Sequence, residues 1–228
     1  MTGWRGLIGA TWLFCVLGAA GAAQAAETYS YSVRHPNFGD IGTYTDRIER
    51  GADQWRVDTT IHIAVRALGI VVHREDAHRL QVWRNGRLVR FEGVTTTNGA
   101  RLEIEGAARD DGFAVVTPDG TALAPADVVP SDPWQASRAA AGATAATMLS
   151  TKSGRVEPVR QVDGGPALLS VHGIDIPVRH YAFASDKRQE VWIDSRGIPV
   201  QFRTVENGTP IDFVLTRETL ATLAALPQ

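Results

Sequence analysis

Residues 80–106 read LQVWRNGRLVRFEGVTTTNGARLEIEG and contain Asn-Gly twice, at Asn85-Gly86 and at Asn98-Gly99. Both central residues of a type I′ turn need positive φ, which Asn and Gly tolerate best, and this turn matches the twist of two antiparallel strands. The stretch therefore predicts three consecutive strands joined by two tight hairpins.

The two turns also predict which face of these strands is buried, because side chains alternate between faces along a strand. In the predicted register, Val82 lies opposite Val89, Leu80 lies opposite Phe91, and Thr95 lies opposite Leu102. The predicted apolar face carries Leu80, Val82, Val89, Phe91, Thr95, Leu102 and Ile104. The predicted polar face carries Gln81, Arg90, Glu92, Arg101, Glu103 and Glu105. Trp83, opposite Leu88, is the large apolar exception on that polar face.

The same alternation extends along most of the chain. Residues 54–65, QWRVDTTIHIAV, place Val57, Thr59, Ile61, Ile63 and Val65 on one face. A third Asn-Gly, at residues 207–208, predicts a hairpin in which Phe202 lies opposite Phe213 and Arg203 lies opposite Asp212. About eleven or twelve strands in sequential hairpins indicate an antiparallel sheet.

One segment departs from this pattern. Residues 131–151, SDPWQASRAAAGATAATMLST, have Asp132 as a capping residue, Pro133 at the first helical position and many alanines. They predict one helix at about 133–149, with Trp134 and Met148 on the face toward the sheet.

The fold class expected from these patterns is mainly β, a large curled antiparallel sheet (an incomplete β-barrel) wrapped over one α-helix. A slender helix leaves room for an apolar cavity. The predicted cavity lining consists of Leu80, Val82, Val89, Phe91, Leu102, Ile104, Trp134, Met148, Phe202 and Phe213.

The first 25 residues have the composition of a secretory signal peptide. MTGWRG carries one positive charge, at Arg5, the following LIGATWLFCVLGAAGAA is apolar, and residues 23–25 (AQA) fit a cleavage site. We expect cleavage before Ala26 and no transmembrane anchor afterwards, because the apolar run is shorter than the ~18 residues that span a membrane. A retained anchor is the alternative.

The mature chain, predicted to be a single domain over residues 26–228, lacks the only cysteine, Cys15. Without Arg5, 22 of the 23 basic residues remain against 25 acidic ones, so no basic surface recommends a nucleic-acid partner. A cysteine-free, mildly acidic, exported chain indicates the periplasm.

His73, Glu75, Asp76 and His78 form a compact set of possible metal ligands. On a strand, His73 and Glu75 share one face while Asp76 and His78 share the other, so the four do not converge, and their spacing matches no zinc signature. We therefore expect no metal site, and the sequence indicates no cofactor.

Two further polar patterns can be interpreted either as functional sites or as ordinary structural features. Asp58 and His62 lie on one strand face, where Asp and His can act together as a general base. An exposed polar strand face gives the same pattern, and no Gly-x-Ser-x-Gly sequence accompanies it. Residues 150–154, STKSG, lack the order of a phosphate-binding loop and are interpreted as the end of the predicted helix. The catalytic residues of any enzyme therefore stay unassigned.

The apolar run within residues 66–76, RALGIVVHRED, also has two interpretations. A buried bend between two long strands is favoured. The alternative is an exposed lip that admits a lipid or touches a membrane.

Several stretches resemble known families. The long meander, single helix and final hairpins containing VWIDSRGIPVQFR (residues 191–203) are similar to the periplasmic lipoprotein-carrier (LolA-like) fold. IAVRALGIVVHRE, VWRNGRLVRFEG, STKSGRVEPV and VWIDSRGIPVQFRTVENGTPIDFVLT are similar to exported bacterial proteins known only as a domain of unknown function. The resemblance implies an incomplete β-barrel, which in carriers of this shape holds acyl chains, and it implies no catalytic residues.

We therefore expect non-catalytic binding or carriage of an apolar ligand, such as a lipid or an acyl chain. Two alternatives stay open: an enzyme acting on an apolar substrate on the same scaffold, and a fully packed structural or adaptor module of the cell envelope. The enzyme is less favoured because the predicted inward positions are almost wholly apolar. The sequence names neither the ligand nor a protein partner.

Overall fold

The computed structural model describes residues 26–135, 145–184 and 188–224, so the predicted signal peptide lies outside the described residues. The first strands are β1 (Glu27–His35), β2 (Gly39–Arg50), β3 (Gln54–Ala67), β4 (Ile70–Arg84), β5 (Arg87–Thr97), β6 (Ala100–Arg109), β7 (Gly112–Thr117) and β8 (Gly120–Ala124). The remaining strands are β9 (Val129–Pro130), β10 (Ala145–Leu149), β11 (Val156–Val171), β12 (Ile174–Ala184), β13 (Arg188–Ile193), β14 (Pro199–Glu206) and β15 (Thr209–Leu215). The helical elements are the 3-10 turn η1 (Pro133–Gln135) and the helix α2 (Arg217–Ala224).

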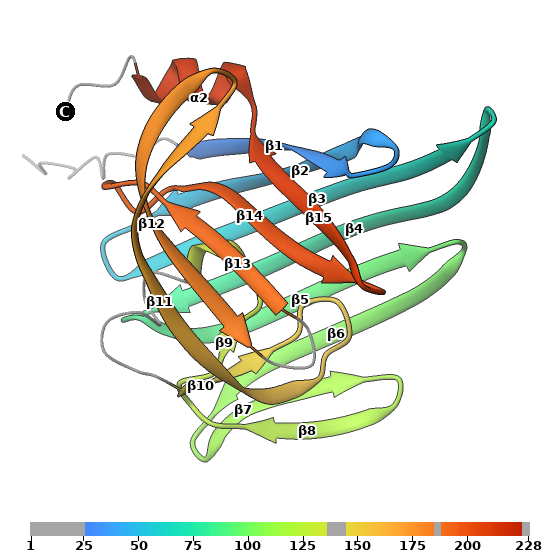
Figure 1. The fold of residues 1–228 in the computed structure, drawn as a ribbon. Helices are drawn as coiled ribbons and strands as arrows, with labels where there is room; N and C mark the ends of the chain where they lie inside the picture. The colour runs from blue at the N-terminus through green and yellow to red at the C-terminus, as the bar shows by residue number, and fades with distance from the viewer. Residues whose placement is uncertain (1–25, 136–144, 185–187, 225–228) are drawn as a thin grey trace, which may run out of the picture.

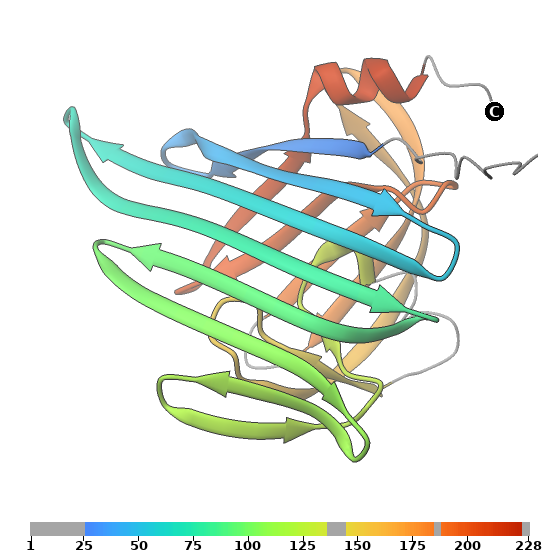
Figure 2. The same ribbon diagram turned by 180° about the vertical axis from the view of Figure 1, so that it is seen from behind.

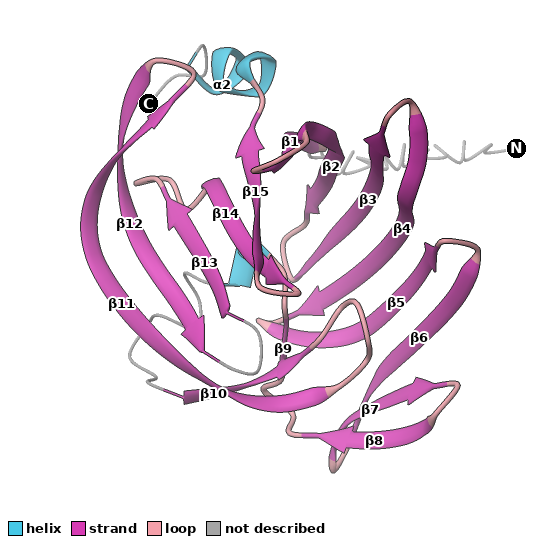
Figure 3. Ribbon diagram, turned by 45° about the vertical axis from the view of Figure 1, so that its right-hand side comes forward, coloured by secondary structure: helices cyan, strands magenta, loops and turns pink. Residues whose placement is uncertain are grey.

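The fifteen strands of the described residues belong to one sheet, in the order β8-β7-β6-β5-β4-β3-β2-β1-β15-β14-β13-β12-β11-β10-β9. Neighbouring strands are antiparallel except β9 and β10, which are parallel. The chain thus builds a first arm, β1–β8, and a second arm, β9–β15, which join where β1 pairs with β15. Figures 1–3 show the two arms curling toward each other, and the sheet does not close into a barrel. The predicted fold class is confirmed.

The Asn-Gly turns form as predicted, and they fix the hairpins. Asn85, Asn98 and Asn207 have φ of 48°, 50° and 50°. The pairs Thr95–Leu102, Phe202–Phe213 and Arg203–Asp212 are present in the expected register. Arg203 Nε lies 2.6 Å from Asp212 Oδ1, so that pair also forms the predicted ion pair.

The predicted face of β4 is wrong, because β5 contains a bulge. Trp83 pairs with Leu88 as expected, but the register then shifts, and Val82 lies opposite Arg90 rather than Val89. Extra residues of this kind displace every later pair on the strand. The inner face of β4 therefore carries Glu75, Ala77, Arg79, Gln81 and Trp83, all buried, while Leu80 and Val82 point to the other face.

The predicted helix is wrong over its C-terminal part. Residues Ala145–Leu149 form β10, which pairs with β11 and β9, and Pro133–Gln135 form only the 3-10 turn η1. Residues 136–144 lie outside the described residues. Helix propensity is a weak preference that strand pairing overrides, and here a hairpin partner and a sheet edge were both available to this alanine-rich segment. The one α-helix among the described residues is α2, whose Leu223 is buried in the core.

Two apolar clusters fill most of the interior. One joins β1–β3 to β12–β15 and includes Tyr31, Ile48 and Phe202 together with Trp134 from η1. The other lies on β4–β8 and includes Phe91 and Phe113, with Leu149 of β10 packed against it. The segment from β9 to β10 therefore contributes side chains to both clusters. These described side chains supply part of the packing for which the sequence predicts a long helix.

Phe91→Asp tests the inner face of β5. Phe91 is fully buried in the second cluster. A carboxylate at this position loses the ring contacts and is desolvated without a partner, which costs several kcal/mol, about 3–5 for the ring alone. We expect loss of the cooperative thermal transition measured by circular dichroism.

Glu103→Lys is the matched control on the outer face of the neighbouring strand. Glu103 is exposed and its ion pair with Arg101 is a surface one, worth about 0–1 kcal/mol. The melting temperature should change little. A Phe91→Asp protein that melts like the wild type would contradict the assigned faces.

Candidate functional site

A cavity of about 460 Å³ lies between the two arms of the sheet. This volume falls within the roughly 300–1,000 Å³ of pockets that hold small molecules. Strands β2, β3 and β4 form one side and β14 and β15 form the other, with Met148 of β10 and the β10–β11 loop closing the interior. Its apolar lining is Ile41, Tyr44, Ile61, Ile63, Val65, Met148, Phe202, Ile211 and Phe213.

Aromatic rings hold the two arms together beneath this apolar wall. Phe202 and Phe213 stack with ring centroids 4.3 Å apart, and Tyr44 meets their edges at 5.1 and 5.6 Å. The buried Tyr31 contacts Tyr44 and Phe202 and donates its hydroxyl to the carbonyl of Pro199 at 2.9 Å. Such edge and stacked contacts favour a fixed arrangement of the rings, so the wall is preformed.

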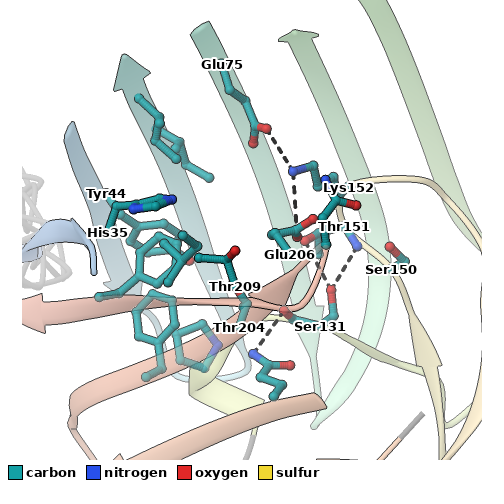
Figure 4. A pocket seen from close by; sticks show the side chains of 18 of the residues that line it. His35, Tyr44, Glu75, Ser131, Ser150, Thr151, Lys152, Thr204, Glu206 and Thr209 are labelled. Carbon is teal, nitrogen blue, oxygen red and sulfur yellow. Dashed lines mark hydrogen bonds and ion pairs between the residues drawn. The ribbon is translucent and has the colours of Figure 1, made fainter. Parts of the chain in front are cut away.

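A polar bridge crosses from one arm to the other beside the cavity (Figure 4). Lys152 in the β10–β11 loop places its Nζ 2.9 Å from Glu75 Oε2 on β4 and 3.7 Å from Glu206 Oε1 at the end of β14. Glu75 is only 4% exposed, so its carboxyl group is buried against this lysine. The bridge therefore ties three segments together at the cavity wall.

A buried hydrogen-bond network fixes residues 131–135, the crossing segment, against the inner face of β2 and β4. The Trp134 indole Nε1 donates to Asp46 Oδ2 at 2.6 Å, and Gln81 Nε2 donates to Asp132 Oδ2 at 2.6 Å. The Trp134 backbone N–H donates to Asp132 Oδ1 at 3.0 Å. Burial raises the pKa of Asp46 to about 6 and that of Asp132 to about 7, against the opposing effect of these hydrogen bonds. Neither carboxyl group lines the cavity.

Arg79 lines the cavity from the inner face of β4. Its side chain is a cation inside a mostly apolar space, and it is 7% exposed. Among the described residues, its Nε has no hydrogen-bond acceptor. The cavity thus combines apolar walls with one buried positive group.

The predicted site residues separate into three groups. Met148, Phe202 and Phe213 line the cavity, and Trp134 is buried next to it in the same cluster. Phe91 and Ile104 are buried in the other cluster, with Leu102 packed against them, away from the cavity lining. Leu80, Val82 and Val89 are half-buried and do not line it, because the bulge in β5 changes the register.

The residues that sequence reasoning missed are the charged ones, Glu75, Arg79 and Lys152. From the sequence alone, Glu75 is considered only as a possible metal ligand, and Lys152 is interpreted as part of the end of a helix. One signal was present in the sequence: Trp83, the large apolar exception on the predicted polar face of β4, is 2% exposed. Taken as the marker of the inner face, Trp83 places Arg79 and Glu75 inside by simple alternation.

Of the residues considered as metal or catalytic sites, Asp58, His62, Asp76 and His78 lie on the outer face, whereas His73 and Glu75 line the cavity. His78 Nε2 lies 2.8 Å from Asp58 Oδ1, and His62 Nδ1 lies 2.8 Å from Asp76 Oδ1, both as exposed cross-strand pairs. The expected separation of Glu75 from Asp76 and His78 onto opposite faces is confirmed. Within the described ranges, no group of three or more His, Cys, Asp or Glu side chains is arranged to hold a metal ion.

The apolar run after Arg66 is exposed, so the favoured buried bend is wrong. Leu68 and Gly69 form the turn between β3 and β4, with φ of 50° and 81°. Leu68 is fully exposed and Ile70 is 69% exposed, at a hairpin tip that projects beyond the neighbouring strands (Figure 3). The hairpin continues directly from Val65 and His73, which line the cavity. An apolar tip therefore stands beside the cavity.

Asp46→Asn tests the buried network through its pH dependence. The pKa of Asp46 is about 6 in the folded state, against an ordinary value of 3.8. The folded state therefore binds the proton of Asp46 more tightly than the unfolded state does. The contribution of Asp46 to the free energy of unfolding therefore falls as pH rises from about 4 to about 6 and then levels off, by on the order of 3 kcal/mol. Asn can accept from the Trp134 indole and donate to the Thr59 hydroxyl, so it keeps the network neutral at every pH.

The melting temperature of Asp46→Asn relative to wild type should rise between pH 4 and pH 6 and stay constant above it. Thermal unfolding followed at several pH values gives this difference directly. A difference that is independent of pH would mean that Asp46 keeps its ordinary pKa when folded.

Neither helical element among the described residues is long and apolar enough to cross a membrane. The fold is similar to a crystal structure described as a beta-barrel-like protein of the domain of unknown function DUF1849 from Brucella abortus, with a TM-score of 0.63 and 12% sequence identity. That match covers 85% of this chain and 96% of the other. A DUF1089 family protein from Pseudomonas aeruginosa matches with a TM-score of 0.40 and 12% identity, over 69% of this chain and 87% of the other.

The search of curated proteins finds no match. The family model of DUF6134, a domain of unknown function, matches residues 31–216. The chain belongs to the DUF6134 family.

Proposed function

We propose that this protein binds an apolar or amphipathic small molecule, such as an acyl chain, in the cavity between the two arms, and carries it without chemical change. The observation that supports this most is the cavity of about 460 Å³ with its apolar side walls. A sheet that curls without closing can admit a ligand between its arms. The resemblance to LolA-like carriers, drawn from the sequence, points the same way, and residues 1–25 support a periplasmic location.

Two features favour binding over catalysis. The carboxyl groups with raised pKa, Asp46 and Asp132, lie outside the cavity lining, and each accepts hydrogen bonds that fix the crossing segment. The exposed Asp–His pairs lie on the outer face, where no apolar substrate would be held. A general base has to reach the proton that it removes, and neither these two carboxyl groups nor the Asp–His pairs line the cavity. Glu75 and Glu206 do line it, and both are paired with Lys152.

A fully packed structural module is the other alternative. A substitution that fills the cavity distinguishes this alternative from a carrier. Thr204 lines the cavity on β14, so Thr204→Trp should occupy part of the ligand space. We expect the wild type to bind the neutral fluorescent probe N-phenyl-1-naphthylamine and Thr204→Trp to bind it at least tenfold more weakly. Fluorescence titration measures both affinities.

Thr43→Trp is the control, because Thr43 is exposed on β2 and does not line the cavity. It should bind the probe as the wild type does, and both variants should keep the wild-type circular dichroism spectrum. If Thr204→Trp does not fold, Ile63→Phe adds less volume at the same cavity. A folded wild type that takes up no probe would rule out the carrier.

The apolar hairpin tip supports a further part of this proposal, loading from a lipid surface. Leu68 and Ile70 can enter the edge of a bilayer, and the exposed Arg66 beside them favours an anionic one. Replacing both apolar residues, Leu68→Ser with Ile70→Ser, should slow transfer of a fluorescent fatty acid from phosphatidylglycerol vesicles several-fold. Affinity for the soluble probe and the melting temperature should not change. An unchanged transfer rate would show that the hairpin takes no part in loading.

A further inference from the structure

The cavity contains a buried cation without a counterion of its own. Arg79 is more than nine-tenths buried and lines the cavity, and its Nε finds no acceptor. Over the described part of the chain, its guanidinium takes part in no ion pair. Buried charges in proteins are normally paired, and an unpaired polar group of this kind calls for an explanation.

The immediate surroundings on the sheet supply no negative charge. In the rows of paired residues, Arg79 lies between Thr59 on β3 and Gly93 on β5. Along its own strand, the neighbours on the same face are Ala77 and Gln81. None of these four residues carries a charge, and beside Gly93 the ring of Phe91 occupies the place that a side chain would take.

The nearest buried acids are committed to other donors. Asp46 accepts from the Trp134 indole and from Thr59, and Asp132 accepts from Gln81 and the Trp134 backbone. Arg79 lowers the pKa of both carboxyls, yet burial still leaves the pKa of each raised. The two acids therefore behave as parts of the crossing network rather than as dedicated partners of the arginine.

The position of Arg79 orients a ligand. Along the inner face of β4, Ala77, Glu75 and His73 follow Arg79 toward the hairpin tip, and Glu75 lies roughly 13 Å further along the strand. Ile61, Ile63 and Val65 accompany them on β3. An anionic group placed near the hairpin end would meet Glu75, which Lys152 already pairs, whereas one placed beside Arg79 would meet a cation that forms no ion pair among the described residues.

We propose that the cavity selects an anionic single-chain amphiphile, whose carboxylate or phosphate group pairs with Arg79 while its chain extends along Ile61 and Ile63 toward the β3–β4 hairpin. This inference rests on the proposed function and adds the ligand's charge and orientation to it. A guanidinium binds carboxylate and phosphate through paired N–H donors, and a dry cavity strengthens that contact. The ligand supplies the missing counterion.

The test compares ligands that share one chain and differ in charge. Dodecanoate, dodecyl phosphate and dodecanol compete with N-phenyl-1-naphthylamine for the wild type, Arg79→Met and Arg79→Lys, all below their aggregation concentrations. The wild type should prefer dodecanoate or dodecyl phosphate over dodecanol by at least tenfold. Which anion binds more tightly distinguishes a carboxylate from a phosphate ligand. Arg79→Met should lose the preference for the anions but should still bind the neutral probe. Arg79→Lys should retain part of the preference for the anions.

Stability without ligand separates this role from a structural one. Replacing an unpaired buried cation by an apolar side chain of similar length should leave the melting temperature unchanged or raise it. If Arg79 were instead a counterion of Asp46 and Asp132, Arg79→Met would lower the melting temperature. Arg101→Met, on the exposed outer face of β6, is the control and should change neither stability nor ligand preference.

Two results would overturn the inference. One is a wild type that binds the neutral probe without preferring the anions, which would leave the proposed function intact. The other is an Arg79→Met protein that keeps the preference. A wild type that binds neither the probe nor any of the three ligands would remove the proposed function as well.

Discussion

The hydrogen bond from the Trp134 indole to the buried Asp46 carboxyl, 2.6 Å long, holds the interior of this fold in place. An open sheet that curls must cover its inner face, and it has no long helix among the described residues to do so. Residues 131–135 cover part of it, and they are held by Asp46 on β2 and by the contact between Gln81 and Asp132. These bonds are strong because they are buried and involve carboxyl groups.

The crossing segment separates a packed part of the interior from the part that contains the cavity. On one side, Phe91, Phe113 and Leu149 pack as an ordinary core. On the other, Ile61, Ile63 and Val65 of β3 and Ile211 and Phe213 of β15 line the cavity, with Arg79 at its inner side and the Lys152 bridge beside it. The apolar walls and the buried charge together favour a ligand that has both an oily chain and a negative group.

The sequence predicted most of the fold and only part of the site. Turns such as Asn98-Gly99 depend on two adjacent residues, so the register of the hairpin could be predicted from them. The inner face of β3 and the pair Phe202–Phe213 were also predicted correctly. The face of β4 did not follow, because one bulge near Val89 changes the parity and propensity rules do not locate bulges.

The helix prediction failed for a related reason, since strand pairing outweighed alanine propensity at Ala145–Leu149. Lys152 reaches the cavity only through its contact with Glu75, a distant part of the chain. Asp46 and Trp134, which hold the crossing segment, are 88 residues apart. No local pattern carries that information.

Native mass spectrometry of the folded protein, purified without detergent, tests the central claim most directly. The account predicts a complex heavier than the chain itself, whose extra mass is lost on denaturation and recovered in the organic extract as an anionic single-chain lipid. If only the mass of the chain itself is found, even after the folded protein has been incubated with fatty acids, the account is contradicted.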